Sequence, residues 1–489
     1  MRSTAAASDV LREGLTAIET EFALPTAFPA EVDAAAAAAT ADLSGRVDLR
    51  TIPFVTLDPA ASTDLDQAFA ITGDGSDLIL SYAIADVGAF VPVGSVLDVE
   101  AWGRGVTVYL PHRRVPQYPP ALSERAASLL PDGDRPAVVF TVAIAADGSP
   151  SLRDAQRAVV RSRSKRGYET TDPDDIPLLA ELARRAAAND AVRGAQRVEP
   201  PEQEIIDDLS ARSGIGLQFR ARRASESANA ALSLACNMAV AATSAAAGVG
   251  LFRDLAEPDD REIASLRRVA AGFGIAWEPG ESLTTLAGRL DPAHPRDATL
   301  QLAARRAGGG ARYRFYENGP DGRLAPSTRV GRGPIVLPSP TPDSSPQGSP
   351  WHAAMAAPYV HATAPLRRLA DRSVVDLAVL LRTGGSPTND ARDRLAALPA
   401  VMARADGVAA RVERACLDLA ETVLLRDRVG ELFDAVVVDT NKDGCTITVA
   451  APAVRARLSH TSREPGDRVR VRLTEADPET RTVRFEPAS

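Results

Sequence analysis

The chain has 489 residues, which is enough for about two to four domains and a large core. Its hydrophobic content of 45% and charged content of 25% are ordinary for a soluble globular protein. A net charge of −8 excludes a generally basic coat for nucleic acid, although a local basic channel is compatible with it. The sequence has neither a signal peptide nor a run of about 18 apolar residues, so we expect no membrane contact.

The basic residues are almost all arginine, because Lys165 and Lys442 are the only lysines. Arginine suits phosphate binding, but genome base composition is the simpler explanation of this usage. The cysteines Cys236, Cys416 and Cys445 lie far apart and form neither a zinc-binding spacing nor a disulfide framework. This pattern predicts a reducing, cytoplasmic location.

The first 45 residues are predicted to be helical, because apolar residues recur there at helical spacing. The next distinctive stretch, Thr56 to Ala68, holds Asp58, Asp64 and Asp66 among mostly uncharged residues. Asp58 precedes a proline, and this pair should open a turn. We predict that Asp64 and Asp66 begin a strand and point to one face of it.

A turn that brings Asp58 back over that face would gather three carboxylates. Such a cluster attracts hard cations such as magnesium, and phosphodiester hydrolysis is the usual chemistry of the resulting site. The alternative is that these residues are solvated turn formers. The flanking sequence favours the first interpretation, because residues 78–87 read as a second strand joined to the first by a turn at 73–76.

Further along the chain, residues 138–144 read as a strand. Residues 157–166 form a basic strand or strand end, which is either a charged sheet edge or a phosphate contact. We predict helices from 176 to about 275, with a buried central helix at 228–247. Residues 334–350 read as a surface insert. Helices are expected again over 352–382 and 388–427.

Five short motifs occur in one order: Thr56-Leu-Asp-Pro with Asp64-Leu-Asp66, Ile84-Ala-Asp-Val87, Gly105-Val-Thr-Val-Tyr-Leu-Pro111, Leu251-Phe-Arg253, and Tyr359-Val-His-Ala-Thr-Ala-Pro-Leu-Arg-Arg368. This series resembles the catalytic (RNB) domain of the ribonuclease II / ribonuclease R family and covers roughly residues 50–385. One such motif is weak, whereas five in order are specific.

The resemblance implies an α+β fold in which the helical segment 1–45 precedes an RNB-type domain at 46–427, a mixed sheet with packed helices. Residues 428–489 would form an OB-fold barrel, with strands at 433–439, 445–449, 469–473 and 482–485. Arg468, Arg470 and Arg472 would line one face of this barrel, where RNA phosphates could lie.

The resemblance also implies the activity: metal-dependent hydrolysis of single-stranded RNA from 3′ to 5′, releasing nucleoside 5′-monophosphates. Magnesium is the expected ion, manganese is the alternative, and no organic cofactor is expected. By family position, the metal ligands would be Asp58, Asp64 and Asp66, and the catalytic residues Asp66 and Arg367. The expected RNA contacts are Tyr109, Arg367, Arg368 and Glu413.

Two of these positions also have a purely structural alternative, since Tyr109 could be a core tyrosine and Arg367 a helix-surface arginine. The chain also departs from the family at three points. Gln67 stands where the family has a further aspartate, Ala230 and Ala231 fall where many members have glutamates, and the chain leaves no room for cold-shock domains. These departures motivate a second hypothesis, an RNA-binding protein of this fold with little or no catalysis.

Overall fold

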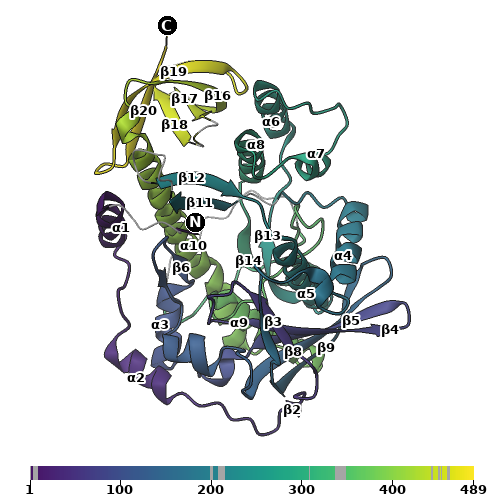
Figure 1. Cartoon of the computed structure of the whole chain (residues 1–489). Coiled ribbons are helices and arrows are strands. Elements are labelled where there is room, and N and C mark those ends of the chain that lie inside the picture. Colours follow the sequence, from purple (N-terminus) through teal and green to yellow (C-terminus); the bar gives the residue numbers. More distant parts are fainter. Residues whose placement is uncertain are drawn as a thin grey trace.

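The largest element is a seven-stranded mixed sheet (Figure 1), whose strand order is β10-β3-β4-β5-β8-β9-β2. The edge strands β10 and β2 pair in parallel with β3 and β9, and the other neighbours are antiparallel. The strands are β2 (Val47–Asp48), β3 (Val55–Asp58), β4 (Gln67–Asp74), β5 (Asp77–Ala85), β8 (Arg135–Ile144), β9 (Pro150–Val160) and β10 (Ser164–Gly167). This computed structural model describes residues 2–3, 9–198, 202–207, 215–307, 309–335, 348–441, 444–449, 452, 454–459 and 463–488.

The predicted hairpin is confirmed as β4 and β5, and the predicted strand at 138–144 lies within β8. β8 is buried along nearly its whole length, as expected for a central strand covered on both faces. The basic stretch 157–166 is divided between the end of β9 and β10, so it is not one strand.

Helix α5 (Ala224–Ala246) packs on β3, β5, β8 and β9, and α9 (Leu369–Arg382) packs beside it on β9. α5 is rich in alanine and serine, which let its backbone approach the sheet closely. The predicted central helix at 228–247 is thereby confirmed to within one residue at its end.

The uniformly helical prediction for 176–275 is wrong, because strands alternate there with helices. β11 (Glu202–Asp207) pairs with β12 (Ile215–Arg220) and with β1 (Arg2–Ser3), and β13 (Val249–Asp254) pairs with β14 (Arg312–Asn318), next to β15 (Leu324–Pro326). Partners distant in sequence decide these strands, so local periodicity misses them. Besides α5, the helices between residues 176 and 306 are α4 (Leu179–Arg193), α6 (Asp260–Gly272), α7 (Leu283–Arg289) and α8 (Pro295–Arg306).

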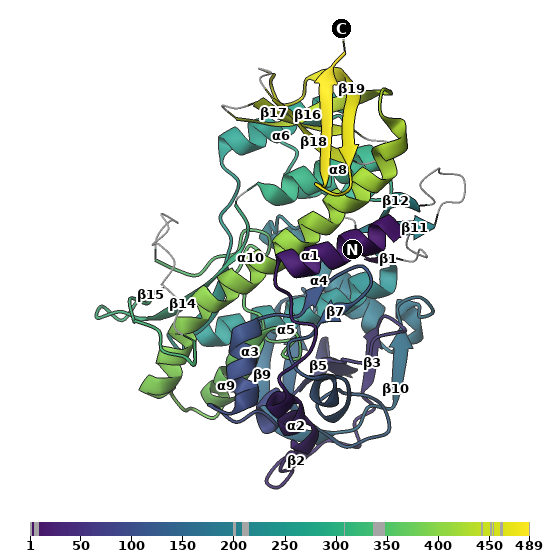
Figure 2. The same ribbon diagram turned by 90° about the vertical axis from the view of Figure 1, so that its left-hand side faces the viewer.

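Helix α10 (Asn389–Leu425) confirms the predicted long helix and runs from α9 to the C-terminal barrel (Figures 1 and 2). Its 37 residues make it about 55 Å long. The N-terminal segment forms α1 (Asp9–Glu21) and α2 (Ala30–Ala38), as predicted, and α1 lies along α10. Gly14 of α1 faces Leu419 so closely that a Cβ there would lie 2.6 Å from its methyl carbons.

The C-terminal barrel is closed in the order β16-β17-β18-β20-β19. It has five strands where the sequence predicted four, since β18 was missed: β16 (Leu432–Asn441), β17 (Gly444–Val449), β18 (Val454–Ser459), β19 (Arg468–Asp477) and β20 (Thr482–Pro487). On β19, Arg468, Arg470 and Arg472 are exposed and alternate with apolar residues, as predicted.

The helix predicted over 352–382 begins only at Leu369, and residues 352–368 are irregular. Most of the predicted insert at 334–350 falls on residues 336–347, outside the described residues. Among the helices described, none is both long and apolar enough to cross a membrane.

Candidate functional site

The acidic residues singled out in the sequence lie along the loop between β3 and β4. Asp58 is the last residue of β3, whereas Asp64 and Asp66 precede β4. The predicted strand start at Asp64 is therefore wrong. The cause is Leu65, whose N–H donates to Ser128 Oγ at 2.9 Å and so pairs outside the sheet.

Asp66 is the most constrained of the three carboxylates, with only 3% of its surface exposed. Its Oδ1 accepts a hydrogen bond from the N–H of Leu366 at 2.7 Å, and its Oδ2 accepts one from Nε of Arg367 at 2.8 Å. Burial raises the pKa of Asp66 to about 6, against the lowering effects of Arg367 and the Leu366 N–H. The carboxylate is therefore mostly ionised at neutral pH and fixed in orientation.

Asp64 is held by an arginine from a small hairpin, β6 (Val108–Tyr109) and β7 (Arg114–Val115). Nη1 of Arg114 lies 2.5 Å from Asp64 Oδ1, and Nη2 lies 2.7 Å from a carboxylate oxygen of Glu124. Arg114 thus bridges two acids at the edge of the site.

Asp58 is the least compensated acid. Its carboxylate accepts no hydrogen bond from the residues described. Burial, with a smaller contribution from the nearby Asp66 and Asp64, raises the pKa of Asp58 to about 7, although Arg367 opposes the shift. Lys165 donates to two carbonyls of the loop that follows Asp58, which fixes that loop.

Within the described ranges, no three acidic, histidine or cysteine side chains are gathered closely enough to hold a metal ion. Arg114 and Arg367 bind Asp64 and Asp66 in this arrangement. The donor set nevertheless fits a hard cation, because it is made of carboxylates and includes a buried acid that a cation would neutralise. Binding a cation would require the arginines to yield part of their contact with the acids.

The raised pKa of Asp58 predicts a pH-dependent effect of Asp58→Asn. The folded-state pKa of about 7 exceeds the ordinary value of 3.8, so the protonated form stabilises the fold. That contribution is complete below about pH 4 and is lost as pH rises through 7. In chelator, the substitution should therefore stabilise the protein by roughly 1–2 kcal/mol more at pH 8 than at pH 5, measured by denaturant unfolding.

Asp147→Asn is the matched control, because Ser149 donates to this exposed carboxylate and lowers its pKa. Its effect on stability should be the same at pH 5 and pH 8, because this acid titrates below both values in the folded and unfolded states. An equal gain for Asp58→Asn at both pH values would contradict the buried, protonatable carboxylate.

Arg367 lies in the irregular segment 359–368, and backbone pairing with residues 105–107 fixes its position. Thr107 N–H donates to the Arg367 carbonyl at 3.0 Å, and Leu369 N–H donates to the Gly105 carbonyl at 2.9 Å. Gly105 has φ of 75°, and a Cβ there would lie 2.5 Å from that of Ala405. This position therefore requires glycine.

The same pairing brings Tyr109 beside the acids, within electrostatic reach of Arg367, Asp64 and Asp66. Tyr109 is 49% exposed, so the alternative of a core tyrosine is wrong. An exposed ring at this place is available for stacking on a base.

Arg367 and Arg368 differ in their surroundings. Nε and Nη2 of Arg368 bind Asp371 at 2.9 and 2.8 Å, and Asp371 is fully buried. Arg367 keeps 42% of its side chain exposed while bound to Asp66. Arg367 is therefore the more accessible cation, and Arg368 chiefly anchors the segment.

Gln67 turns its amide toward residues that the sequence analysis missed. Its Nε2 donates to the carbonyl of Thr363 at 2.6 Å. Its Oε1 accepts from the hydroxyl of Tyr82 and, at 3.3 Å, from Ser233. The register places Gln67 opposite Ile84, so Tyr82 is its diagonal neighbour on the same face, a signal that the hairpin pattern could have provided.

Glu413 lies on α10 and lines a cavity of about 710 Å³ between β12, α8, α10 and the barrel. Neither the three aspartates nor Arg367 is among the residues that line this cavity with Glu413. The lining is rich in arginine: Arg222, Arg305, Arg306, Arg414 and Arg455. Partial burial, and to a smaller extent the neighbouring Arg455 and Arg414, lower the pKa of Arg306 to about 10.

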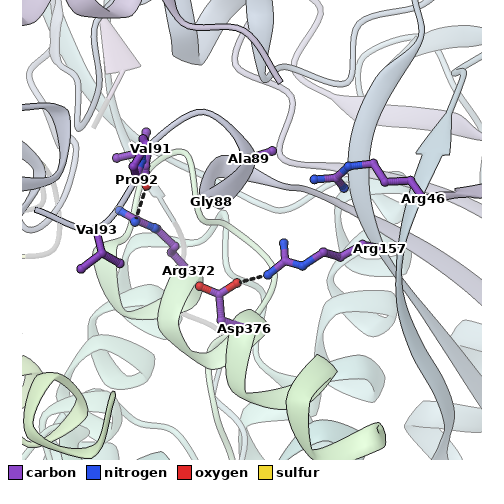
Figure 3. Close-up of a pocket in the computed structure, with 9 residues that line it drawn as sticks. All are labelled: Arg46, Gly88, Ala89, Val91, Pro92, Val93, Arg157, Arg372 and Asp376. Carbon is purple, nitrogen blue, oxygen red and sulfur yellow. Dashed lines mark hydrogen bonds and ion pairs between the residues drawn. The ribbon is translucent and has the colours of Figure 1, made fainter. Parts of the chain in front are cut away.

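A second cavity, of about 290 Å³, lies between β9, α9 and residues 88–93 (Figure 3). Arg157 crosses it and binds Asp86 and Asp376, each at 2.6 Å. Arg161 similarly binds Asp134. Because these arginines of the stretch 157–166 are paired with acids, the structure favours the structural interpretation of that stretch over phosphate contact.

Comparisons with known proteins agree with this architecture. The RNB domain matches residues 46–378, and the RNase II-type exonuclease C-terminal S1 domain matches residues 431–488. Exoribonuclease 2 of Erwinia tasmaniensis is 41% identical over 126 residues, which cover 25% of this chain and 19% of that protein. Ribonuclease R of Chlamydia pneumoniae is 30% identical over 284 residues, which cover 54% of this chain and 42% of that protein.

Among solved structures, Mycoplasma genitalium RNase R in complex with ribose-methylated single-stranded RNA superposes with a TM-score of 0.77 and 20% identity. The match covers 98% of this chain and 78% of that one. The sequence matches above span less than half of the curated relatives. The shared fold therefore extends over nearly all of this chain, whereas the sequence likeness is confined to parts of it.

Proposed function

This chain belongs to the RNB-domain family, and from that membership and its carboxylate–arginine site we propose that it hydrolyses single-stranded RNA from the 3′ end, releasing nucleoside 5′-monophosphates. The observation that supports this most is the buried Asp66 bound to the half-exposed Arg367, with Asp58, Asp64 and Tyr109 nearby. Acids, an accessible cation and an aromatic ring together suit a phosphodiester at the end of a strand.

In this proposal, each group has a distinct task. Asp58, Asp64 and Asp66 would hold divalent metal, magnesium or manganese, which makes a water nucleophilic and relieves charge on the phosphate. Arg367 would bind the scissile phosphate by charge-assisted hydrogen bonds. Tyr109 would stack on the terminal base and so set the position of the last phosphodiester. The proposal is tested by the products formed from RNA labelled at either end.

We further propose that the arginine-lined cavity beside the barrel binds RNA phosphates upstream of the site. Arg305 and Arg306 are exposed at the end of α8, and arginines outnumber the two glutamates along the cavity lining. Each phosphate contact releases counterions, so binding there should depend strongly on salt. Glu413 would then border this path without touching the terminal phosphate.

The double substitution Arg305→Ala with Arg306→Ala should weaken RNA affinity across sequences. It should also make the slope of log affinity against log salt shallower by about 1 to 2. Fluorescence anisotropy over a salt series measures both quantities. Arg153→Ala with Arg184→Ala removes two exposed arginines elsewhere and should leave the slope unchanged. An unaltered slope in the first variant would show that the cavity does not hold phosphates.

A further inference from the structure

The geometry points to a positioning role for Gln67: its amide fixes the segment 359–368, and so the placement of Arg367 over Asp66, instead of serving as a metal ligand. This inference rests on the proposed function, because Arg367 matters for turnover only if it binds the RNA phosphate. It concerns one of the positions at which the chain departs from the family pattern.

The segment 359–368 has no regular secondary structure, and buried side chains satisfy its backbone groups. Asn237 accepts from Ala362 N–H at 2.9 Å, and Asp371 accepts from Thr363 N–H at 3.0 Å. Gln67 instead acts as a donor, to the carbonyl of Thr363. Since Thr363 is only 2% exposed, that carbonyl would lack a partner if the donor were lost.

The partners of Gln67 explain why an amide, and not a carboxylate, stands there. Oε1 faces two hydroxyls, Tyr82 and Ser233, and an amide oxygen has two lone pairs for two donors. Nε2 faces a carbonyl, which a carboxylate would repel. The Ser233 hydroxyl, which has one proton, lies 2.8 Å from the Tyr82 hydroxyl and 3.3 Å from Oε1. Oε1 therefore sits in a network of protein hydroxyls and presents at most one lone pair to an ion.

Adjacent residues of one chain segment thus hold the segment 359–368 at two points. The side chain of Asp66 binds the Leu366 N–H and Arg367, and Gln67 binds Thr363, four residues before Arg367. The two contacts fix both the position and the tilt of the segment over the start of β4. Loss of the Thr363 contact would let Arg367 shift relative to Asp66.

The test is Gln67→Glu, which keeps the size of the side chain but removes the donor. We expect kcat at saturating magnesium to fall on the order of tenfold or more, as for other small displacements of a catalytic group. The magnesium concentration that gives half-maximal activity (the magnesium midpoint) should stay unchanged. Affinity for RNA in chelator should stay within about twofold of wild type, since most phosphate contacts lie elsewhere. Gln67→Met, which carries no charge, should also lose turnover and would show that repulsion is not the cause.

Graded variants separate positioning from general disruption. Tyr82→Phe removes a donor to Oε1 but leaves the Thr363 contact, so its loss should be smaller than that of Gln67→Glu. Ser233→Ala removes the longest contact and should cost least. Gln218→Glu, on the exposed side of β12, is the matched control for the charge change and should have no effect.

Hydrogen exchange of peptides covering 359–368 gives a readout that does not depend on turnover. Exchange should be faster in Gln67→Glu than in wild type, and faster in Tyr82→Phe if the first variant does not fold. Unchanged exchange in these variants would overturn the inference. A wild-type protein that releases no nucleotides would overturn the proposed function, but it would leave the exchange result valid as a test of the inference. A lower magnesium midpoint with equal or higher kcat in Gln67→Glu would assign the position to metal binding.

Discussion

Asp66→Asn is expected to lower the rate of nucleotide release by about 1000-fold or more, while RNA affinity changes little. The substitution removes one anion from the acidic site, and such carboxylates supply several kcal/mol of transition-state stabilisation through the metal that they hold. Asparagine keeps the volume and one oxygen acceptor for the N–H of Leu366. It cannot accept at both positions, so the contact with Nε of Arg367 is lost as well.

The measurement is mononucleotide release at saturating magnesium, with RNA affinity determined separately in chelator. Asp74→Asn, on the exposed end of β4, is the matched control and should keep full activity. A retained rate in Asp66→Asn would place the chemistry elsewhere in the protein. A large loss of RNA affinity would mean that the carboxylate serves binding and not turnover.

Arg367→Ala should lower kcat by about 100- to 1000-fold, because a preorganised cation facing the phosphate is lost. Arg367→Lys should restore little of this, since an ammonium cannot present several N–H groups in a fixed plane to both Asp66 and a phosphate. Arg382→Ala, at the exposed end of α9, controls for the loss of positive charge. Equal activity of Arg367→Lys and wild type would show that the planar guanidinium is not required at this position.

The Arg367 variant also carries a pH signature. Arg367 lowers the pKa values of both Asp66 and Asp58, which burial raises to about 6 and about 7. Without the guanidinium, both acids should have higher pKa values, so protons should compete with metal for these carboxylates up to a higher pH. The acidic limb of the pH–rate profile should therefore move to higher pH in Arg367→Ala. An unmoved limb would show that these acids do not control the rate.

Local patterns predicted the parts of the fold that depend on local spacing. Helix α10 follows from a sustained helical period, and the hairpin β4–β5 follows from two apolar strands around a short turn. The family motifs singled out Asp66 and Arg367, which the structure brings into contact, because each motif is contiguous in the sequence. The segment 352–368 was predicted helical because its composition permits a helix.

What the sequence did not show is decided by partners far along the chain. Asp66 meets Leu366 and Arg367, about 300 residues away, and Gln67 meets Thr363. Such contacts take up the backbone groups of 359–368, so the segment has no need of helical hydrogen bonds. The same contacts explain why the missing aspartate at Gln67 cannot be judged from the motif alone: its neighbours, not its spacing, determine what the amide does.

The most direct test of the proposed function uses single-stranded RNA with a free or a blocked 3′ end, incubated with the purified chain and magnesium. We expect nucleoside 5′-monophosphates to be released from the 3′ end stepwise. A 3′ block should stop the release, a 5′ block should leave it unchanged, and chelator should abolish it. Cleavage of circular RNA, or no release of nucleotides from a free 3′ end at saturating magnesium, would contradict a 3′-to-5′ exoribonuclease.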